Sequence, residues 1–332
     1  MRELVITDNE AGQRLNKYLM KYLNKAPSGF VYKMLRKKNI KLNDAKVTGS
    51  EMIYKGDVVK LFMSDETIAN FRDEKAFGRV SHASGNFRLD VIYRDADILI
   101  ADKPAGVLSQ KASPSDYSLN DALISYLLEK DIMTEEDMSM FKPSICNRLD
   151  RNTSGIILCG ISLKGSQELS RMLKERRIDK YYLTIVKGHV KKEMRCSAFL
   201  LKDEKTNKVK VYEELPQDSS EKKIEKIITE YTPLKTNGSY TLLRVKLITG
   251  KTHQIRAHLA YMGYPVAGDR KYGDEAANIS LAKKYGLKNH LLHCARVVFP
   301  KDGMSLSEDL KGREFTAFLP DTFKRIEKDL FE

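Results

Sequence analysis

Short apolar segments with the two-residue period of β-strands recur from residue 89 onwards, and stretches with helical spacing lie between them. TLLRVKLI (241–248) alternates apolar and polar residues, and GIILCGIS (155–162) is the continuous apolar run of a buried strand. Residues 119–128 repeat their apolar positions at the spacing of an amphipathic helix. Interleaved strands and helices of this kind predict an α+β fold, in which a mixed, largely antiparallel sheet is flanked by helices.

The first 64 residues follow a different pattern. Helical spacing predicts two short helices, at 13–23 and 30–38, and small strands separated by glycine turns follow them. The next stretch, 65–87, is mixed and polar, which is typical of a linker. We therefore predict a small αβ domain at 1–64, a linker at 65–87 and a larger domain at 88–332.

Positive charge is concentrated near the N-terminus. The chain carries a net charge of +13, and residues 12–64 contain twelve Lys or Arg residues against three Asp or Glu residues, a local surplus of nine. Such a surplus favours a polyanionic partner, with nucleic acid favoured over a membrane surface. A basic module without such a partner is the alternative. No apolar run approaches the ~20 residues of a membrane span, so we expect no membrane partner.

The cysteines and the N-terminus bear on the compartment. Four cysteines lie far apart, at positions 146, 159, 196 and 294, without a Cys-x-x-Cys pair. This spacing favours reduced thiols over a disulfide framework. MRELVITDNE at the N-terminus lacks the apolar segment of a secretory signal. We expect a cytoplasmic protein and a monomer.

Common cofactor and nucleophile motifs are missing from the sequence. TGKTHQ (249–254) contains Gly-Lys-Thr, but a phosphate-binding loop needs a glycine at position 245, which is a valine. No Gly-x-Ser-x-Gly and no Gly-x-Gly-x-x-Gly after a strand is present. His290, His293 and Cys294 form only a weak zinc pattern, and His253 and His258 fit structural hydrogen bonding better than acid–base roles. We expect no cofactor and no metal.

NRLDRNTSG (147–155) places Asp150 between two arginines. Exposed ion pairs stabilise a protein by only about 0–1 kcal/mol, so the pattern fits an ordinary surface pair. It also fits an acid that has to stay ionised beside a polyanion, because a nearby cation lowers the pKa of a carboxyl group. The nine residues alone leave both interpretations open.

Several segments in a fixed order resemble a known family. In the larger domain they are DILIADKPAG (97–106), NRLDRNTSG (147–155), KYYLTIVKG (180–188) and TGKTHQIRAHLAYMGYPVAGDRKYG (249–273). These segments resemble the pseudouridine synthases of the ribosomal large-subunit (RluA/RluC/RluD) family over roughly residues 89–320. The N-terminal pieces RLNKYL (14–19), IKLND (40–44) and YKGDVVKL (54–61), with the basic second helix, resemble an S-four-type RNA-binding domain.

The resemblance implies that the chain isomerises specific uridines in RNA to pseudouridine, most simply in large-subunit (23S) ribosomal RNA, with transfer RNA or a dual substrate as the alternatives. Detaching, turning and rejoining the uracil needs no cofactor, but it needs one carboxylate that attacks the nucleotide or removes a proton from the sugar. The resemblance assigns this role to Asp150, leaves the two mechanisms open, and pairs Asp150 with Arg256. Tyr182 matches the tyrosine that packs on the target base, although Tyr181 is an equal candidate by chemistry alone.

The resemblance also implies RNA contacts. Arg148 matches an arginine that enters the RNA near the space that the base vacates, Ile255 lines the pocket, and Arg151 contacts phosphate. With Lys103 as a turn and groove residue and the basic N-terminal helices, the predicted RNA-binding residues are Arg148, Arg151, Ile255, Lys103, Arg14, Lys33, Arg36, Lys37 and Lys38. We expect Thr252 to cap the helix that carries Arg256.

Two other functions fit part of the pattern. An RNA-binding protein with an inactive catalytic domain, such as a ribosome assembly factor, has the same basic surface. A hydrolase acting on nucleosides usually needs two carboxylates on opposite sides of the bond, and only one acid lies in the motif cluster. Asn147 departs from the family, which commonly has histidine there, but asparagine keeps the capacity to form hydrogen bonds.

Overall fold

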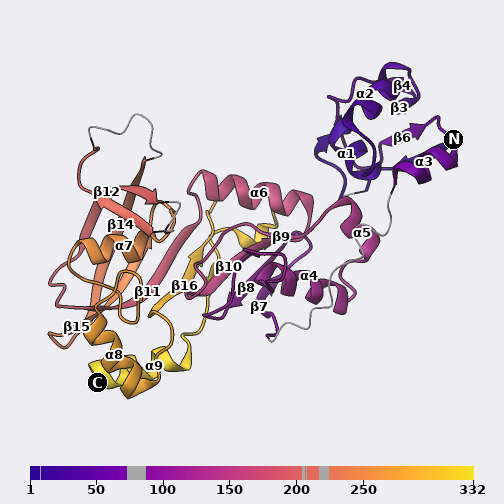
Figure 1. Ribbon diagram of the computed structural model, residues 1–332. Coiled ribbons are helices and arrows are strands. Elements are labelled where there is room, and N and C mark those ends of the chain that lie inside the picture. Colours follow the sequence, from indigo (N-terminus) through magenta and orange to yellow (C-terminus); the bar gives the residue numbers. More distant parts are fainter. Residues whose placement is uncertain (8, 73–86, 204–205, 207, 217–223) are drawn as a thin grey trace.

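A computed structural model of the chain describes all residues except 8, 73–86, 204–205, 207 and 217–223 (Figure 1). The described residues form a small N-terminal group of elements and a larger group from residue 87 onwards. The small group has a buried core of its own, separate from the main core of the large one. The predicted α+β class is confirmed, because a large mixed sheet is flanked by helices.

The described residues of the N-terminal group form three helices and six short strands. Its elements are β1 (Arg2–Val5), β2 (Gln13–Arg14), α1 (Leu15–Tyr22), α2 (Ser28–Arg36), β3 (Ile40–Leu42), β4 (Ala45–Lys46), β5 (Met52–Ile53), β6 (Val58–Leu61) and α3 (Asp65–Phe71). The sheet has the strand order β1-β6-β3-β4, and β2 pairs with β5. Helices α1 and α2 bury the residues that helical spacing predicts, among them Leu15, Leu19 and Val31.

Helix α3 corrects the predicted linker. The first residues of the expected linker form this helix, because Ser64 caps it by accepting a hydrogen bond from the Thr67 backbone N–H and Ile68 is buried in the N-terminal core. Ile68 and Phe71 are the large apolar residues of this stretch, and two positions are too few to establish a helical period. The rest of the predicted linker, from 73 to 86, lies outside the described residues.

The large group is built on an 11-stranded sheet. Its strands are β7 (Asp90–Arg94), β8 (Ile98–Lys103), β9 (Ser144–Ile145), β10 (Ser154–Gly160), β11 (Asp179–Lys187), β12 (Met194–Asp203), β13 (Lys208–Tyr212), β14 (Ile224–Thr236), β15 (Tyr240–Leu247), β16 (Leu292–Val298) and β17 (Glu314–Thr316). The order is β13-β12-β14-β15-β11-β16-β10-β8-β7, with β17 on β16 and β9 on β10. Among the strands described, β10 and β16 form the parallel pair.

Helices cover the sheet and its ends. They are α4 (Leu119–Glu129), α5 (Glu135–Met140), α6 (Leu163–Lys174), α7 (Gln254–Tyr261), α8 (Glu275–Tyr285) and α9 (Asp321–Phe331), with a short 3-10 turn at Glu308–Leu310. Figure 1 shows α6 lying across the sheet and α8 beside α9 near the C-terminus. The amphipathic helix predicted at 119–128 is α4, which buries Leu119, Leu123 and Leu127.

The charged pattern of residues 191–230 predicts a hairpin with its turn at 205–208 and an irregular remainder. The hairpin is confirmed, because Asp203 pairs with Lys208 across the ends of β12 and β13, although positions 205 and 207 lie outside the described residues. The expectation of an irregular remainder is wrong for the described residues, because β12 and β14 pair over most of their lengths. Charged residues on the exposed faces of these strands hid the alternation, although Leu200 and Ile227 are buried on the other face.

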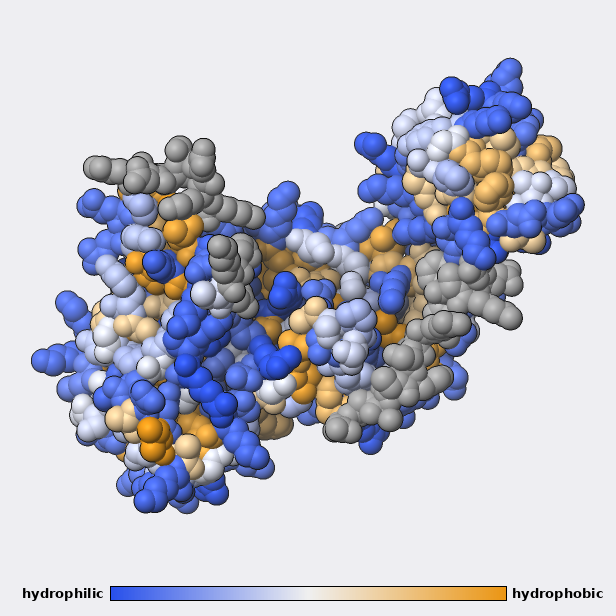
Figure 2. Space-filling view, in the orientation of Figure 1, coloured by the Kyte–Doolittle hydropathy of each residue, from blue (hydrophilic) through white to orange (hydrophobic). Residues whose placement is uncertain are grey.

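Hydrophilic side chains cover most of the face shown in Figure 2, with apolar residues gathered in smaller patches. Within the part of the chain that the structure describes, no helix combines the length and the apolar character that crossing a membrane requires.

Candidate active site

A cavity of about 1310 Å³ opens in the large group of elements. Its walls come from segments far apart in the sequence, chiefly 108–112, 146–153, the start of β11 and the stretch 247–256. Three of these segments carry the motifs singled out in the sequence, so the fold brings those motifs to one place.

Asp150 lies in the loop between β9 and β10, and local contacts hold this loop in shape. The Thr153 backbone N–H donates to the Asp150 carbonyl at 3.1 Å, which closes a turn. The Ser109 hydroxyl donates to the Leu149 carbonyl at 2.8 Å and accepts from the Leu149 N–H at 3.1 Å. The loop enters β10 through Gly155, at φ +107°, where an added Cβ would lie 2.3 Å from the Cys294 carbonyl oxygen. Only glycine fits this position.

Lys103 lies beneath the same loop and is fully buried. Its ammonium donates to the carbonyl oxygens of Pro104 at 3.0 Å, Val107 at 2.8 Å and Arg151 at 3.0 Å. Burial lowers the pKa of Lys103 to about 7, against the opposing charges of Asp150 and Asp102. The prediction of an RNA contact at Lys103 is therefore wrong, since a buried amine that already binds three carbonyls ties the Asp150 loop to β8 and does not face the groove.

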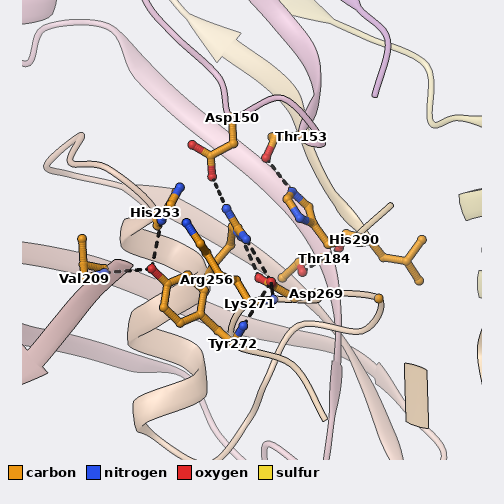
Figure 3. Close-up of polar contacts among 12 residues, drawn as sticks. Asp150, Thr153, Thr184, Val209, His253, Arg256, Asp269, Lys271, Tyr272 and His290 are labelled. Atoms are coloured by element: carbon orange, nitrogen blue, oxygen red, sulfur yellow. Dashed lines mark hydrogen bonds and ion pairs between the residues drawn. The ribbon is translucent and has the colours of Figure 1, made fainter. Parts of the chain in front are cut away.

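Asp150 and Arg256 form an ion pair at the wall of the cavity (Figure 3). The Arg256 Nη1 donates to the Asp150 Oδ2 at 2.7 Å, and the side chains are 8% and 26% exposed, respectively. The guanidinium reaches this position from the first turn of α7, across a sequence separation of 106 residues. The pairing that the resemblance implied is present in the structure.

A second carboxylate, Asp269, holds the other side of the same guanidinium (Figure 3). The Arg256 Nε donates to the Asp269 Oδ2 at 2.6 Å and the Nη2 donates to the Asp269 Oδ1 at 2.9 Å. The Asp269 side chain is fully buried, and burial raises its pKa, but the hydrogen bonds and charge of Arg256 outweigh that effect and lower it. Backbone N–H groups of Lys271 and Tyr272 also donate to the Asp269 Oδ1, at 2.8 and 3.2 Å.

Tyr272 and His253 complete a polar layer behind the ion pair. The Tyr272 ring lies under the Arg256 guanidinium, 5.3 Å from its carbon to the ring centroid, and its hydroxyl is hydrogen-bonded to His253 Nδ1 at 2.9 Å. His253 occupies the N-cap position of α7 with φ 52°, so the predicted Thr252 cap is wrong by one residue. The bond to Tyr272 accompanies this left-handed backbone, which non-glycine residues rarely adopt.

The remaining histidines of the region have structural partners. His258 is hydrogen-bonded to the Tyr231 hydroxyl at 2.9 Å, His290 to Thr153 at 2.8 Å and His293 to Ser154 at 2.8 Å. Burial lowers the pKa of each of these three histidines to about 4, so all are neutral near pH 7. Among the residues that the structure describes, no three His, Cys, Asp or Glu side chains are grouped so that they could hold a metal ion.

The structure separates the two neighbouring tyrosines. Tyr182 is 5% exposed and lines the cavity, as does Ile255 at 4% exposed. Tyr181, one residue earlier on β11, packs against the Arg296 guanidinium at 4.1 Å and does not line the cavity. Because successive strand residues point to opposite faces of a sheet, only one of the pair can reach the site. Tyr182 is the one in place.

The predicted RNA-binding arginines divide between two regions. Arg148 and Arg151 are exposed and line the cavity. The basic residues of the N-terminal group are exposed and lie away from the cavity walls; they are Arg14, Lys33, Arg36, Lys37 and Lys38. Asn147 uses its side-chain oxygen to accept the Leu158 N–H at 2.7 Å, which fixes the loop before Asp150.

Sequence reasoning missed Asp269, Tyr272 and the role of His290. Asp269 and Tyr272 lie in the segment VAGDRKYG of the motif at 249–273, but the resemblance assigns no role to any residue of this segment. One signal was available, because an arginine on a helix with apolar neighbours needs a buried acidic partner if it is itself buried. Nothing in the sequence shows which acid supplies it.

The chain is similar to known proteins. Residues 97–261 match the family model described as RNA pseudouridylate synthase. The chain is 28% identical to Ribosomal large subunit pseudouridine synthase C of Vibrio cholerae, over 89% of this chain and 87% of that protein. It is 27% identical to the synthase C of Haemophilus influenzae, over 100% and 96%, and 30% identical to the synthase D of Borreliella burgdorferi, over 64% and 63%.

A solved structure shares the fold. Human RNA Pseudouridylate Synthase Domain Containing 4 superposes with a TM-score of 0.55 at 20% sequence identity, covering 77% of this chain and 94% of the human one. At this level of identity the likeness bears on the arrangement of the sheet and helices.

Proposed function

We infer from the matched family model and the named relatives that the chain is an RNA pseudouridine synthase. The proposed substrate is large-subunit ribosomal RNA, with Asp150 as the single catalytic carboxylate and without a cofactor. The ribosomal target is supported by the names of the relatives, which are ribosomal large subunit synthases C and D. Transfer RNA is the alternative substrate.

The observation that carries the proposal for Asp150 is its ion pair with Arg256 at the wall of the cavity, with Nη1 and Oδ2 2.7 Å apart. Making pseudouridine breaks the bond between C1′ and N1 of uracil and forms one between C1′ and C5. A carboxylate serves this reaction by attacking C1′ or by removing the proton at C2′. Either role uses the negative charge of the carboxylate, and the Arg256 guanidinium places a positive charge within hydrogen-bond distance of it.

Asp269 is the positioning residue for Arg256. It engages Nε and Nη2, which leaves Nη1 for Asp150. The planar guanidinium is thereby fixed along two edges, since bidentate pairs of this type have a defined geometry. The catalytic carboxylate consequently faces a cation that cannot turn away from it.

Tyr182 and Ile255 provide the apolar surface for the base. Both line the cavity beside Asp150. Stacking of a base on an aromatic ring stabilises it by ~1–3 kcal/mol, which offsets part of the few kcal/mol needed to bring a uridine out of its stack. Arg148, exposed at the cavity, is placed where it can enter the RNA beside the displaced nucleotide.

The N-terminal group supplies a second RNA contact as an S-four-type domain. Its surplus of basic residues and the exposure of Lys33, Lys37 and Lys38 at and after α2 support this role. Phosphate contacts of this kind position an RNA without reading its sequence. The domain boundaries, revised to place α3 in the small domain, remain part of this proposal.

Asp150→Asn tests the proposal on transcripts of large-subunit ribosomal RNA and of transfer RNA. We expect the wild type to form pseudouridine in the ribosomal transcript, and the variant to form none while its Kd for that RNA stays within about threefold, because an amide can neither attack nor act as a base. Equal product from both proteins would refute the role of Asp150. Modification of the transfer RNA transcript alone would make transfer RNA the substrate in place of ribosomal RNA. Release of free uracil would indicate a hydrolase. RNA binding without any product would indicate an inactive relative.

A further inference from the structure

Lys180 is a cation of the cavity that the proposed chemistry has not used. It stands near the start of β11, two residues before Tyr182, and both residues line the cavity. Residues two apart on a strand point to the same face. The Lys180 ammonium lies next to Gly250, where an added Cβ would be 3.6 Å from Nζ, an ordinary van der Waals distance.

The Lys180 ammonium makes no hydrogen bond and no ion pair with any residue that the structure describes. Two other cations of the cavity wall that are buried or partly buried, Arg256 and Lys251, pair with carboxylates. Lys180 is partly buried without such a partner, and the exposed cations of the wall include Arg148, Arg151, Lys174, Arg176 and Arg270. Burial lowers the pKa of Lys180, with Cys294 opposing the shift. A partly buried amine without a partner is unfavourable unless something bound in the cavity pairs with it.

The proposed reaction produces a group that can pair with such an amine. When the C1′–N1 bond breaks, its electron pair leaves with the uracil, whether Asp150 has attacked C1′ or removed the C2′ proton. The uracil then carries one negative charge, shared between N1, C5 and the two carbonyl oxygens. Carbon C5 uses the same electron pair to bond to C1′. In the first route this breaks the bond between C1′ and Asp150, and in the second route Asp150 returns the proton to C2′. The C5 proton is released and N1 takes up one proton, so substrate and product have the same composition.

We propose that the Lys180 ammonium binds a carbonyl oxygen of the flipped uracil and stabilises the uracil anion, which makes Lys180 a catalytic residue beside Asp150. The inference rests on the proposed function. Its location fits, because the base that packs on Tyr182 lies on the sheet face from which Lys180 projects. Asp150 acts on the sugar and Lys180 acts on the base. The two charged side chains therefore act on opposite sides of the C1′–N1 bond as it breaks.

The test compares Lys180→Met and Lys180→Arg with the wild type under single-turnover conditions, with enzyme in excess over a large-subunit ribosomal RNA transcript labelled with tritium at uracil C5. Tritium release measures the reaction. We expect Lys180→Met to lower the rate about 10²-fold, the effect of losing one donor to a developing anion, with Kd for RNA within about threefold. Lys180→Arg should restore at least a tenth of the wild-type rate. Lys283→Met, on exposed α8, is the control for loss of one positive charge and should match the wild type.

Four outcomes would overturn the inference. A Lys180→Met rate within about twofold of wild type shows that the amine is not used, while the proposed function stands. A Kd raised tenfold or more with an unchanged rate makes Lys180 a phosphate contact. A lowered melting temperature with the rate lost equally in Lys180→Arg makes it a structural residue. A wild type that releases no tritium from ribosomal or transfer RNA, although Lys180 is intact, overturns the proposed function and this inference with it.

Discussion

At the scale of single residues, the site consists of one guanidinium between two carboxylates of different exposure. Asp150 is 26% exposed and available to a ligand, whereas the Asp269 side chain has no exposed surface. The sequence motifs predicted the pair of Asp150 and Arg256, because both residues stand in recognisable patterns. The motifs could not predict Asp269, because the packing of α7 against the following turn decides which acidic residue lies beside the buried Arg256.

Asp269→Asn tests the positioning role. An amide presents one acceptor oxygen to the guanidinium and leaves the partly exposed Asp150 as the remaining charge partner of Arg256. Removing one partner of a buried pair costs up to about 3–5 kcal/mol of unfolding free energy. We expect the single-turnover rate to fall about 10²-fold as Arg256 shifts away from Asp150. Asp269→Glu, which keeps the charge, should recover part of both losses.

The matched control for Asp269 is Asp302→Asn. Asp302 pairs with Arg177 on the surface and is 92% exposed, so its loss should change the unfolding free energy by less than about 1 kcal/mol and the rate not at all. Rates and urea denaturation are measured for all three variants. A wild-type rate in Asp269→Asn would show that Arg256 does not need Asp269 to hold Asp150.

At the scale of elements, prediction succeeded where one face of an element is apolar. The strands β10, β11 and β15 and the helix α4 lie close to their predicted ranges, because their buried residues recur with a period of two or 3.6. It failed at α3, where Ile68 is the buried residue, and at the start of α7. There the backbone at His253 depends on a contact with Tyr272, nineteen residues away, which no local pattern contains.

The junction between the Asp150 loop and β10 supports a prediction on Gly155→Ala. The backbone has φ +107° at this position and an added Cβ would overlap the Cys294 carbonyl. Strained backbone alone costs about 1–3 kcal/mol, and separating β10 from β16 adds to this. We expect a clear loss of unfolding free energy in urea denaturation, together with a lower rate because Asp150 is five residues away.

Gly286→Ala provides the comparison for Gly155→Ala. Gly286 ends α8 at φ +67°, and an added Cβ there meets no atom within 4 Å. This control carries the backbone penalty of about 1–2 kcal/mol without a steric overlap and lies far from Asp150 in the sequence. Equal losses of stability in the two variants would mean that β10 and β16 can separate at no further cost.

At the scale of the whole molecule, three buried histidines make stability depend on pH. His258, His290 and His293 have folded-state pKa values lowered to about 4 by burial, against about 6.5 in an unfolded chain. The unfolded state therefore binds more protons between pH 6.5 and 4, and stability is lost as the pH falls through that window. Each histidine contributes a slope of up to about 1.4 kcal/mol per pH unit.

Urea denaturation at pH 7.5 and pH 5 measures this effect. We expect each histidine to lower the unfolding free energy by about 2 kcal/mol at pH 5, relative to pH 7.5. Replacing one of them, as in His258→Gln, should reduce the pH dependence by about a third even if it lowers stability at both pH values. Equal stability of the wild type at the two pH values would contradict the burial of neutral imidazoles.

The division into a small basic part and a large sheet was visible in the sequence because charge and periodicity change together near residue 64. How the parts meet was not visible. The Gln167 side chain on α6 donates to the Gly12 carbonyl at 3.1 Å, and Arg72 lies 3.8 Å from Glu136 on α5. Met140 on α5 also packs against the N-terminal core. Two polar contacts and one methionine give no periodic pattern from which the junction could be predicted.

The contribution of the N-terminal group to RNA binding can be measured separately from catalysis, as the dependence of RNA affinity on salt concentration. Each phosphate contact with single-stranded RNA changes the slope of log K against log salt by about 0.7. The triple variant Lys33→Gln, Lys37→Gln and Lys38→Gln should therefore flatten the slope by about two units and weaken binding at low salt, with the rate at saturating enzyme unchanged. A second triple variant, with glutamine at the exposed Lys191, Lys192 and Lys226, removes the same charge from the large domain. If both variants flatten the slope equally, the effect belongs to net charge, and the N-terminal group is not a specific RNA contact.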